Sequence, residues 1–326
     1  LCSTACPVGI DTGDLTRRLR GRQLGGAARA VNTWTGEHFG TLANTSRLGL
    51  KVGHAVSGVL GDNFLSRVSG GAWKKHMPYA GKAPAQRSSA GDPVVYFPTC
   101  GSRIFGPAQA GSPQQGDVII EVLKRAGYAP RLPQDFDALC CGQMLSSKGM
   151  AAEADAMSAR LEAALLAASE NGRYPVVMDA SACTTRMQKF LGERLKVYDF
   201  HEFAVDSLLA RLMITRQPGP VALHVNCAVR RTGSDAKLRQ LLQACAEEII
   251  EPAGVTCCGF AGDRGFVVPE LNRHALRHIH DALPAHCGCG VSTNRTCEIG
   301  LTAETGIPFE SVAFLLEKCS RPQPTC

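Results

Sequence analysis

The apolar and polar positions divide the chain into an N-terminal helical segment and a longer region of alternating strands and helices. Amphipathic spacing predicts a short helix over residues 12–20. Residues 26–61 alternate small, apolar and polar residues without proline, which predicts one long helix or two helices broken near residues 36–40. Pro, Gly, Ser and Ala are concentrated in residues 76–93. Such a composition is typical of a linker, so we place the main domain boundary there.

Beyond the linker, short β-branched runs lead into cysteine-containing loops and are followed by helical segments. The first half contains "PVVYFPTC" (93–100), a helix over 113–126, "YAPRLP" (128–133), a helix over 150–171 and "YPVVMDASAC" (174–183). The second half has "PVALHVNC" (220–227), a helix over 235–245, "EEIIEPA" (247–253), a helix over 270–283, "GVSTNRTC" (290–297) and two final helical stretches. This alternation predicts an α/β fold with short parallel sheets flanked by helices.

The two halves also align with each other. "VVYFPTCGSRIFG" (94–106) matches "VALHVNCAVRRTG" (221–233), and "CCGQMLSSKG" (140–149) matches "CCGFAGDRG" (257–265) with one residue deleted. "DASACTTRM" (179–187) matches "TNRTCEIGL" (293–301). An ordered set of Cys, Cys-Cys-Gly and Cys repeated in this way predicts an internal duplication.

Each half therefore presents four cysteines at places where a strand gives way to a loop. They are Cys100, Cys140, Cys141 and Cys183 in the first half, and Cys227, Cys257, Cys258 and Cys297 in the second. Loops beyond the carboxyl ends of parallel strands gather at one edge of a sheet, so these cysteines are expected to converge. Four thiolates are enough for either an iron–sulfur cluster or a tetrahedral zinc ion.

The adjacent cysteine pairs argue against ordinary zinc geometry. Zinc ribbons and fingers space their cysteines two to four residues apart, whereas neighbouring cysteines diverge unless the backbone turns sharply. Gly142 and Gly259 can supply that turn and allow close approach of the backbone to a bulky group. The basic residues Arg103, Arg230, Lys148 and Arg264 would then offset the negative charge of a cluster, or else be solvated charges at helix starts.

Composition and charge narrow the function classes. The chain has 326 residues, of which 44% are hydrophobic and 20% charged, which leaves room for two domains. The net charge of +6 is mild and the 35 basic residues are scattered, so nucleic acid is not an expected partner. No apolar run is long enough to span a bilayer, and no leader for export is apparent. Fifteen cysteines in a long chain of this kind favour metal or cluster ligation over a disulfide framework.

The motifs resemble those of a known family. The repeated CCG motif is similar to the cysteine-rich domain found in heterodisulfide reductase and in the iron–sulfur subunits of anaerobic glycerol-3-phosphate dehydrogenase and glycolate oxidase. "LCSTACPVGIDTGDL", "YFPTC", "CCGQ" with "SKG", "CCGFAGDRGF" and "RTCEIGL" resemble the C-terminal part of bacterial FAD-dependent D-lactate dehydrogenases that reduce cytochromes or quinones. Relatives of those enzymes oxidise D-2-hydroxyglutarate.

The resemblance implies an electron-transfer fragment. An upstream FAD domain of the same polypeptide would oxidise the 2-hydroxy acid, and its electrons would pass through iron–sulfur clusters, of the [4Fe–4S] or another type, to a quinone or cytochrome. No catalytic residue is expected within this fragment. Cys2 and Cys6, followed by Pro7, look like the end of a ferredoxin-like module whose remaining ligands lie upstream. We expect a cytoplasmic location, with peripheral association at the inner face of the membrane left open.

The expected organisation follows from these motifs. It comprises a ferredoxin-like end with a helical segment (1–75), a linker (76–93), a first CCG domain (94–215) and a second CCG domain (216–326).

One departure from the heterodisulfide reductase relatives affects the ligand count. Their motifs end in Cys-x-x-Cys and supply five cysteines to each cluster, but here Ala180 and Asn294 occupy the earlier position of that pair. His201, His224 and Asp179 are candidates for a substitute ligand, with structural roles as the alternative. Two other functions remain open, namely a structural zinc module that docks a partner, and cluster-catalysed disulfide reduction.

Overall fold

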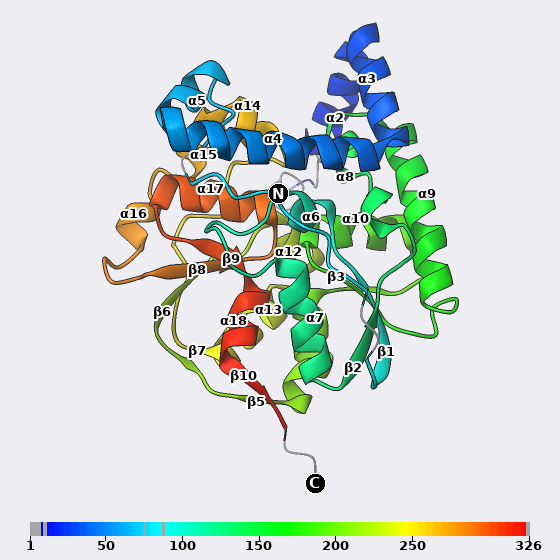
Figure 1. Cartoon of the computed structure of the whole chain (residues 1–326), viewed down its shortest axis with the longest axis vertical. Helices are drawn as coiled ribbons and strands as arrows, with labels where there is room; N and C mark the ends of the chain where they lie inside the picture. Colours follow the sequence, from blue (N-terminus) through cyan, green and yellow to red (C-terminus); the bar gives the residue numbers. More distant parts are fainter. Residues whose placement is uncertain (1–7, 9–11, 75, 87–88, 324–326) are drawn as a thin grey trace.

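The computed structural model describes residues 8, 12–74, 76–86 and 89–323. Its N-terminal helices are α2 (Thr12–Gln23), α3 (Gly26–Glu37), α4 (Phe39–Leu60) and α5 (Asp62–Val68). Helix α4 lies across one end of the molecule, with α2 and α3 rising at one of its ends and α5 at the other (Figure 1). The chain breaks at His38, so the alternative of two helices between residues 26 and 61 is confirmed.

The segment predicted as a linker packs against the body of the protein. Ala80 forms an isolated bridge with Phe105, and the Gly81 amide donates to the Ile104 carbonyl at 2.7 Å. Met77 is buried, and the first strand already begins at Asp92. A proline- and glycine-rich composition thus marks irregular backbone at this place, although part of that backbone is buried.

The first half forms a four-stranded parallel sheet in the order β2-β1-β3-β4. Its strands are β1 (Asp92–Phe97), β2 (Tyr128–Arg131), β3 (Val176–Met178) and β4 (Val197–Asp199). Its helices are α6 (Cys100–Ile104), α7 (Gln115–Arg125), η1 (Phe136–Ala138), α8 (Gln143–Ser147), α9 (Ala151–Ala168), α10 (Ser181–Leu191) and α11 (Phe200–Phe203). Val94, Val95, Val176 and Val177 are fully buried, as expected for parallel strands covered by helices on both faces.

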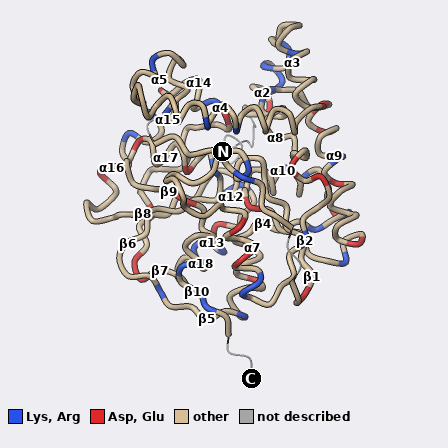
Figure 2. Tube along the Cα trace, viewed as in Figure 1, with Lys and Arg blue, Asp and Glu red and all other residues tan. Residues whose placement is uncertain are grey.

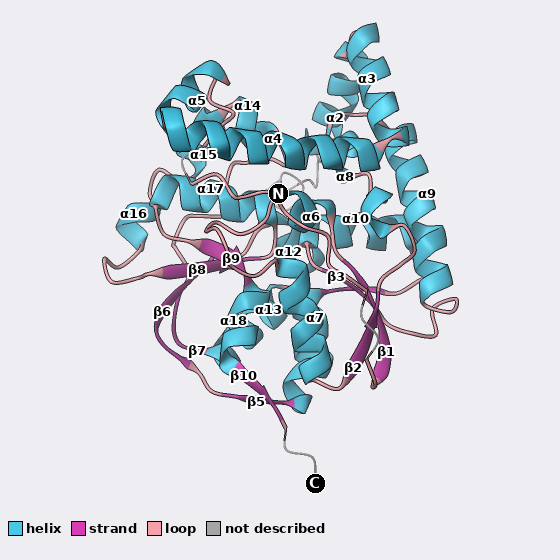
Figure 3. Cartoon of the chain, in the orientation of Figure 1, coloured by secondary structure: helices cyan, strands magenta, loops and turns pink. Residues whose placement is uncertain are grey.

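The second half repeats this topology with the strand order β7-β6-β8-β9, again parallel. Its strands are β6 (Gln217–Leu223), β7 (Ala246–Ile250), β8 (Cys289–Ser292) and β9 (Phe309–Ser311). Its helices are α12 (Cys227–Thr232), α13 (Asp235–Cys245), α14 (Arg264–Val267), α15 (Pro269–Ala275), α16 (Ile279–Ala282), α17 (Arg295–Thr305) and α18 (Val312–Cys319). The predicted α/β fold with two duplicated halves and short parallel sheets is therefore confirmed (Figure 3).

The two halves share one hydrophobic core. Helix α7 of the first half packs against α18 of the second, and the side chains of Leu123 and Leu316 belong to the same buried cluster. The connection between the halves runs through η2 (Ala204–Leu208), η3 (Leu209–Arg211) and β5 (Leu212–Ile214). Strand β5 pairs antiparallel with β10 (Ser320–Pro322), which ties the end of the described chain to this connection.

Two local features differ from the sequence prediction. The expected helix over 270–283 is divided into α15 and α16, because the Ile279 amide donates to Leu276 three residues earlier. This tight turn keeps both Leu276 and Ile279 buried. Strands β4 and β9 were not expected, since each is only three residues long and leaves little periodic pattern.

Charged residues of both signs are interspersed along most of the fold (Figure 2), while α2 carries a cluster of four arginines, Arg17, Arg18, Arg20 and Arg22. Ion pairs such as Arg125–Glu317 at 2.9 Å and Arg239–Glu251 at 2.8 Å join neighbouring elements. No helix within the described residues is both long enough and apolar enough to cross a membrane.

Candidate metal centre

The eight cysteines of the repeats lie in two groups at the carboxyl ends of the strands. The first cage comprises Cys100 at the start of α6, the pair Cys140 and Cys141 before α8, and Cys183 in the first turn of α10. The second cage comprises Cys227 at the start of α12, the pair Cys257 and Cys258 before α14, and Cys297 in the first turn of α17. The first cage lies beside the point where strand order reverses between β1 and β3, and the second lies beside the equivalent point between β6 and β8. Ligands of open parallel sheets usually bind at such points.

In the first cage the four thiols contact one another. The sulfur atoms of Cys140 and Cys100 are 4.0 Å apart, and all four thiols are free. Hydrogen bonds from Cys140 and Cys183 lower the pKa of Cys100 and of Cys141 well below the usual thiol value. The same contacts raise the pKa of Cys140 and of Cys183. These mutual contacts bring all four predicted ligands of this half together.

In the second cage the contacts form a chain. Cys227 and Cys258 donate to Cys257 and lower its pKa, while the same contact with Cys257 raises the pKa of Cys227. The sulfur atoms of Cys258 and Cys297 are 3.1 Å apart, although both thiols are free. The Gly259 amide donates to Cys257 Sγ at 3.3 Å. Cys227 is exposed, so this cage is more open to solvent than the first.

Both glycines of the CCG motifs make the sharp turn that was predicted. Gly142 has φ of +78° and Gly259 has φ of +71°, in the left-handed region that favours glycine. A Cβ at Gly142 would collide with the carbonyl oxygen of Ala154, and one at Gly259 with that of Leu271. Each turn is thus pressed against the second helix after it, α9 or α15, and a side chain would displace the cysteine pair.

Hydrogen bonds from helices hold the cysteine pairs in place. The Ser158 hydroxyl donates to the Cys141 carbonyl at 2.9 Å, and the Asn272 amide donates to the Cys258 carbonyl at 2.6 Å. Sequence reasoning missed both residues. They lie at different distances from their glycines, 16 and 13 residues in the printed sequence, so the alignment of the halves gives no signal for them.

The four basic residues predicted to balance cluster charge have different environments. Arg103 is 1% exposed, and its guanidinium donates to the carbonyls of Phe136 (2.7 Å) and Leu139 just before the first cysteine pair. Its charge also contributes to the low pKa of Cys100, after the thiol contacts. Arg230 is partly exposed, and it donates to the Val225 carbonyl at 3.0 Å.

Lys148 and Arg264 lie at a cavity of about 410 Å³ between the repeats and the N-terminal helices. The Lys148 ammonium is 3.5 Å from the Asp263 carboxylate, and it donates to Asn32 Oδ1 at 3.3 Å. Arg264 is exposed. The structure therefore gives Lys148 a partner in the other repeat, while its predicted role at a cluster stays a prediction. Cys2 and Cys6 lie outside the described residues.

Helices that carry cysteines of the two cages meet at the junction of the repeats. Helix α10, which carries Cys183, packs against α12 of the other repeat, and α17, which carries Cys297, packs against α6. The Ser181 amide donates to the Thr293 carbonyl at 3.0 Å, and their hydroxyls are 2.6 Å apart. These four helices lie in a band beneath α4 (Figure 1). Ligands held in the two cages would consequently be neighbours.

The N-terminal helices cover the first cage. Phe39 and Ala43 of α4 belong to the same buried cluster as Cys140 and Cys141. The Arg47 guanidinium donates to the Arg103 carbonyl at 3.0 Å. Any module that precedes α2 in sequence is therefore connected to the first cage by a packed helix.

The donor set of each cage fits an iron–sulfur cluster. Thiolates are soft ligands that suit such clusters, and the glycine turns leave backbone close to the sulfurs without a side chain between. Within the described part of the chain, no group of three or more His, Cys, Asp or Glu side chains has the arrangement for a single metal ion. The cages are sets of neighbouring thiols in contact through their sulfur atoms.

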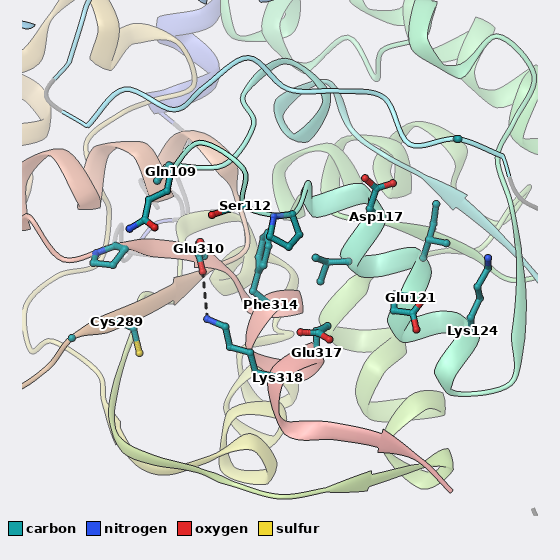
Figure 4. A pocket seen from close by; sticks show the side chains of 17 residues that line it. Gln109, Ser112, Asp117, Glu121, Lys124, Cys289, Glu310, Phe314, Glu317 and Lys318 are labelled. Carbon is teal, nitrogen blue, oxygen red and sulfur yellow. Dashed lines mark ion pairs between the residues drawn. The ribbon is translucent and has the colours of Figure 1, made fainter. Parts of the chain in front are cut away.

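A cavity of about 760 Å³ opens elsewhere, between α7 and α18. Figure 4 shows that its lining includes Asp117, Glu121 and Cys289. The Lys318 ammonium forms an ion pair with the Glu310 carboxylate, at 3.9 Å. The eight cage cysteines do not line this cavity. It is separate from the candidate metal centre.

Fold and site together define a duplicated α/β protein with a cysteine-rich cage in each repeat. The family model described as "CCG: Cysteine-rich domain" matches residues 94–188 and 221–302, more than half of the chain, and these ranges contain both cages. The chain belongs to this cysteine-rich domain family.

Curated proteins and solved structures show limited similarity to the chain. "Lactate utilization protein A 2" of Bacillus mycoides is 25% identical over 60% of this chain and 87% of the relative. "Lactate utilization protein A 1" of the same organism is 24% identical over 56% of this chain and 77% of the relative. The solved aspartate racemase of Picrophilus torridus is 11% identical, with a TM-score of 0.34 over 72% of this chain and 96% of the racemase, and this likeness carries no argument.

Proposed function

We propose that this chain is an iron–sulfur electron-transfer module in which each cage holds one cluster. The observation that carries the proposal is the presence of two matched sets of four thiols on helices that meet at the repeat junction. A single nucleophilic cysteine would not require two such sets. Neighbouring cages suit stepwise transfer of electrons from one site to the next.

The residues of the chain would contribute in distinct ways. The four cysteines of each cage would bind the cluster, which supplies one-electron transfer when bound. Amide groups beside the sulfurs, such as that of Gly259, would donate to them and stabilise negative charge. Arg103 would hold the loop before the first cysteine pair through the Phe136 and Leu139 carbonyls. The burial of Cys140, Cys141, Cys183, Cys258 and Cys297 would exclude water from most of both sites.

We further propose that the electrons come from oxidation of a 2-hydroxy acid, with D-lactate or D-2-hydroxyglutarate as the substrate. The printed names of the curated relatives refer to lactate utilization, which supports this choice of metabolism. An FAD domain would deliver the electrons through a ferredoxin-like module that includes Cys2 and Cys6, and a quinone or cytochrome would accept them. The packing of α4 over the first cage supports entry of electrons from the N-terminal side.

Metal analysis of the anaerobically purified and reconstituted chain tests the proposal. We expect iron and acid-labile sulfide in amounts matching two clusters per chain, with an EPR signal after reduction. Cys141→Ser and Cys258→Ser should each remove about half of the iron. Cys245→Ser is a matched control, because Cys245 is a buried, free thiol outside both cages. A chain that binds zinc without iron would contradict the proposal and favour a structural docking role.

A further inference from the structure

The missing fifth cysteine of each repeat raises the question of a non-cysteine ligand, and three buried side chains are near enough in sequence to be considered. Asp179 is fully engaged. Its Oδ2 accepts hydrogen bonds from the Tyr96 hydroxyl and from the Ser102 hydroxyl, both at 2.7 Å, and its Oδ1 accepts from the Thr99 amide at 2.8 Å. These contacts account for the burial of a carboxylate, so Asp179 has a structural role.

His201 is engaged in the same way. Its Nδ1 lies 2.7 Å from Asp199 Oδ1, and its Nε2 lies 3.0 Å from Ser234 Oγ. Both ring nitrogens therefore have partners, and the ring is completely buried. It is not available to a metal centre.

His224 differs from these two side chains. It is 2% exposed, and its Nδ1 lies 3.1 Å from Ser292 Oγ. The Ser292 hydroxyl in turn donates to the His224 carbonyl at 3.4 Å, so that Ser292 Oγ is left to accept the Nδ1 proton. Nε2 then carries a lone pair, and it is buried without a hydrogen-bond partner among the described residues. A buried polar atom of this kind calls for an explanation.

The position of His224 points to the second cage. It directly follows β6 and precedes Cys227 by three residues. Burial lowers the pKa of His224 to about 4, and the charge of Cys257 partly opposes this effect. Cys257 of the second cage therefore lies within electrostatic reach of the ring. The aligned residue of the first repeat is Phe97, which has no polar atom in its side chain. The two cages are therefore chemically different at this position.

We propose that His224 Nε2 is a nitrogen ligand of the iron–sulfur cluster in the second cage, with Ser292 as the residue that positions its ring. The hydrogen bond to Ser292 is the type of outer contact that fixes the tautomer of metal-binding histidines. This inference rests on the proposed function, because it requires a cluster in the second cage. Four thiolates and one imidazole would then take the place of the five cysteines expected from the heterodisulfide reductase relatives.

The proposal sets an expectation for the reduction potential of the second cluster. A neutral imidazole nitrogen gives an iron–sulfur cluster a higher reduction potential than an anionic thiolate in the same position. His224 would therefore give the second cluster a higher potential than a fifth cysteine would, whereas the first cage has Phe97 at the corresponding position.

Pulsed EPR of the reduced, cluster-loaded chain tests the assignment with ¹⁴N-histidine and ¹⁵N-histidine labelling. A Cys141→Ala background isolates the second cage, and a Cys258→Ala background isolates the first. We expect a strong histidine nitrogen coupling that changes with the isotope from the second cage, and none from the first. The coupling should disappear in His224→Phe, which copies the first repeat, and persist in His201→Gln.

His224→Cys serves as a second variant if His224→Phe does not fold. It should retain iron, lose the nitrogen coupling and lower the potential of the second cluster. Iron and sulfide without a histidine coupling would overturn this proposal alone. A chain without iron and sulfide would overturn the proposed function and this inference with it. A coupling that survives in both His224 variants would assign the nitrogen to another residue and also overturn the inference.

Discussion

Arg103 and Arg230 occupy the same position in the two repeats, yet the structure predicts very different costs for their removal. Arg103 is 1% exposed and donates to three carbonyl groups, those of Thr99, Phe136 and Leu139. It also forms an ion pair with Asp137 at 3.1 Å. Arg103→Ala would leave these buried and partly buried acceptors without their charged donor.

The magnitude follows from these contacts. Hydrogen bonds to charged groups contribute about 1.5–3 kcal/mol each, and removal of one partner from a buried ionic network costs about 3–5 kcal/mol. We therefore expect Arg103→Ala to lower the free energy of unfolding by about 3–5 kcal/mol. Arg230 is 29% exposed, donates to one carbonyl, and pairs with Glu251, which keeps Arg239 as a second partner. For Arg230→Ala we expect about 1 kcal/mol, in the range of exposed ion pairs plus one hydrogen bond.

Urea unfolding under reducing conditions, followed by circular dichroism, measures this difference in the metal-free chain. Arg103→Lys should fall between wild type and Arg103→Ala, because an ammonium group keeps the charge but cannot reach the carbonyls as a planar fork does. Reconstitution should also show weaker iron retention in Arg103→Ala than in Arg230→Ala. Equal losses of stability in the two alanine variants would refute the argument that burial and carbonyl contacts make Arg103 the more important residue.

The structure supports three further predictions. Gly142→Ala should lower the free energy of unfolding by about 2–4 kcal/mol, and Gly233→Ala by about 1 kcal/mol, as measured in thermal melts. Both glycines have positive φ, but only a Cβ at Gly142 would collide with a backbone oxygen. Burial raises the pKa of Asp179, so the folded state binds this proton more tightly than the unfolded state does. The contribution of Asp179 to the free energy of unfolding should therefore fall as pH rises above about 3.8. Urea midpoints measured between about pH 3.5 and 7 should show this decrease in the wild type, and Asp179→Asn should lack it. Ala180→Cys should change the EPR signal of the first cage with little loss of stability. Asn294→Cys should lower the free energy of unfolding by about 1–3 kcal/mol, because the Asn294 side chain accepts a partly buried hydrogen bond from the Ala182 amide.

Much of the fold could be predicted because it depends on local patterns. The helix expected over residues 235–245 coincides with α13, and the β-branched runs before Cys100 and Cys227 coincide with β1 and β6. The alignment of the two halves predicted that their topologies would be equal, as the strand orders show. These features are repeated, long or strongly periodic, and therefore leave a clear signal in one sequence.

The environment of the site could not be predicted to the same degree, because it depends on contacts between distant segments. Ser158 and Asn272 reach the cysteine pairs from helices whose sequences carry no motif. The motifs predict the same role for Lys148 and Arg103, that of a positive charge beside a cluster. In the structure, however, Lys148 forms an ion pair with Asp263 of the other repeat. Burial and partner choice are properties of the assembled structure and not of the spacing.

At the junction between the repeats, neutral side chains occupy the positions of the two absent cysteines. Ala180 and Asn294, at the positions of the absent cysteines, directly precede α10 and α17 where the two repeats meet. Asn294 Oδ1 accepts a hydrogen bond from the Ala182 amide at 3.0 Å, and Thr293 bonds to Ser181 beside it. A thiolate at both positions would place two negative charges close together in a buried interface, where their repulsion is weakly screened. In this chain a neutral polar contact joins the repeats at that point, so a fifth ligand would come from another direction, as we propose for Nε2 of His224 in the second repeat.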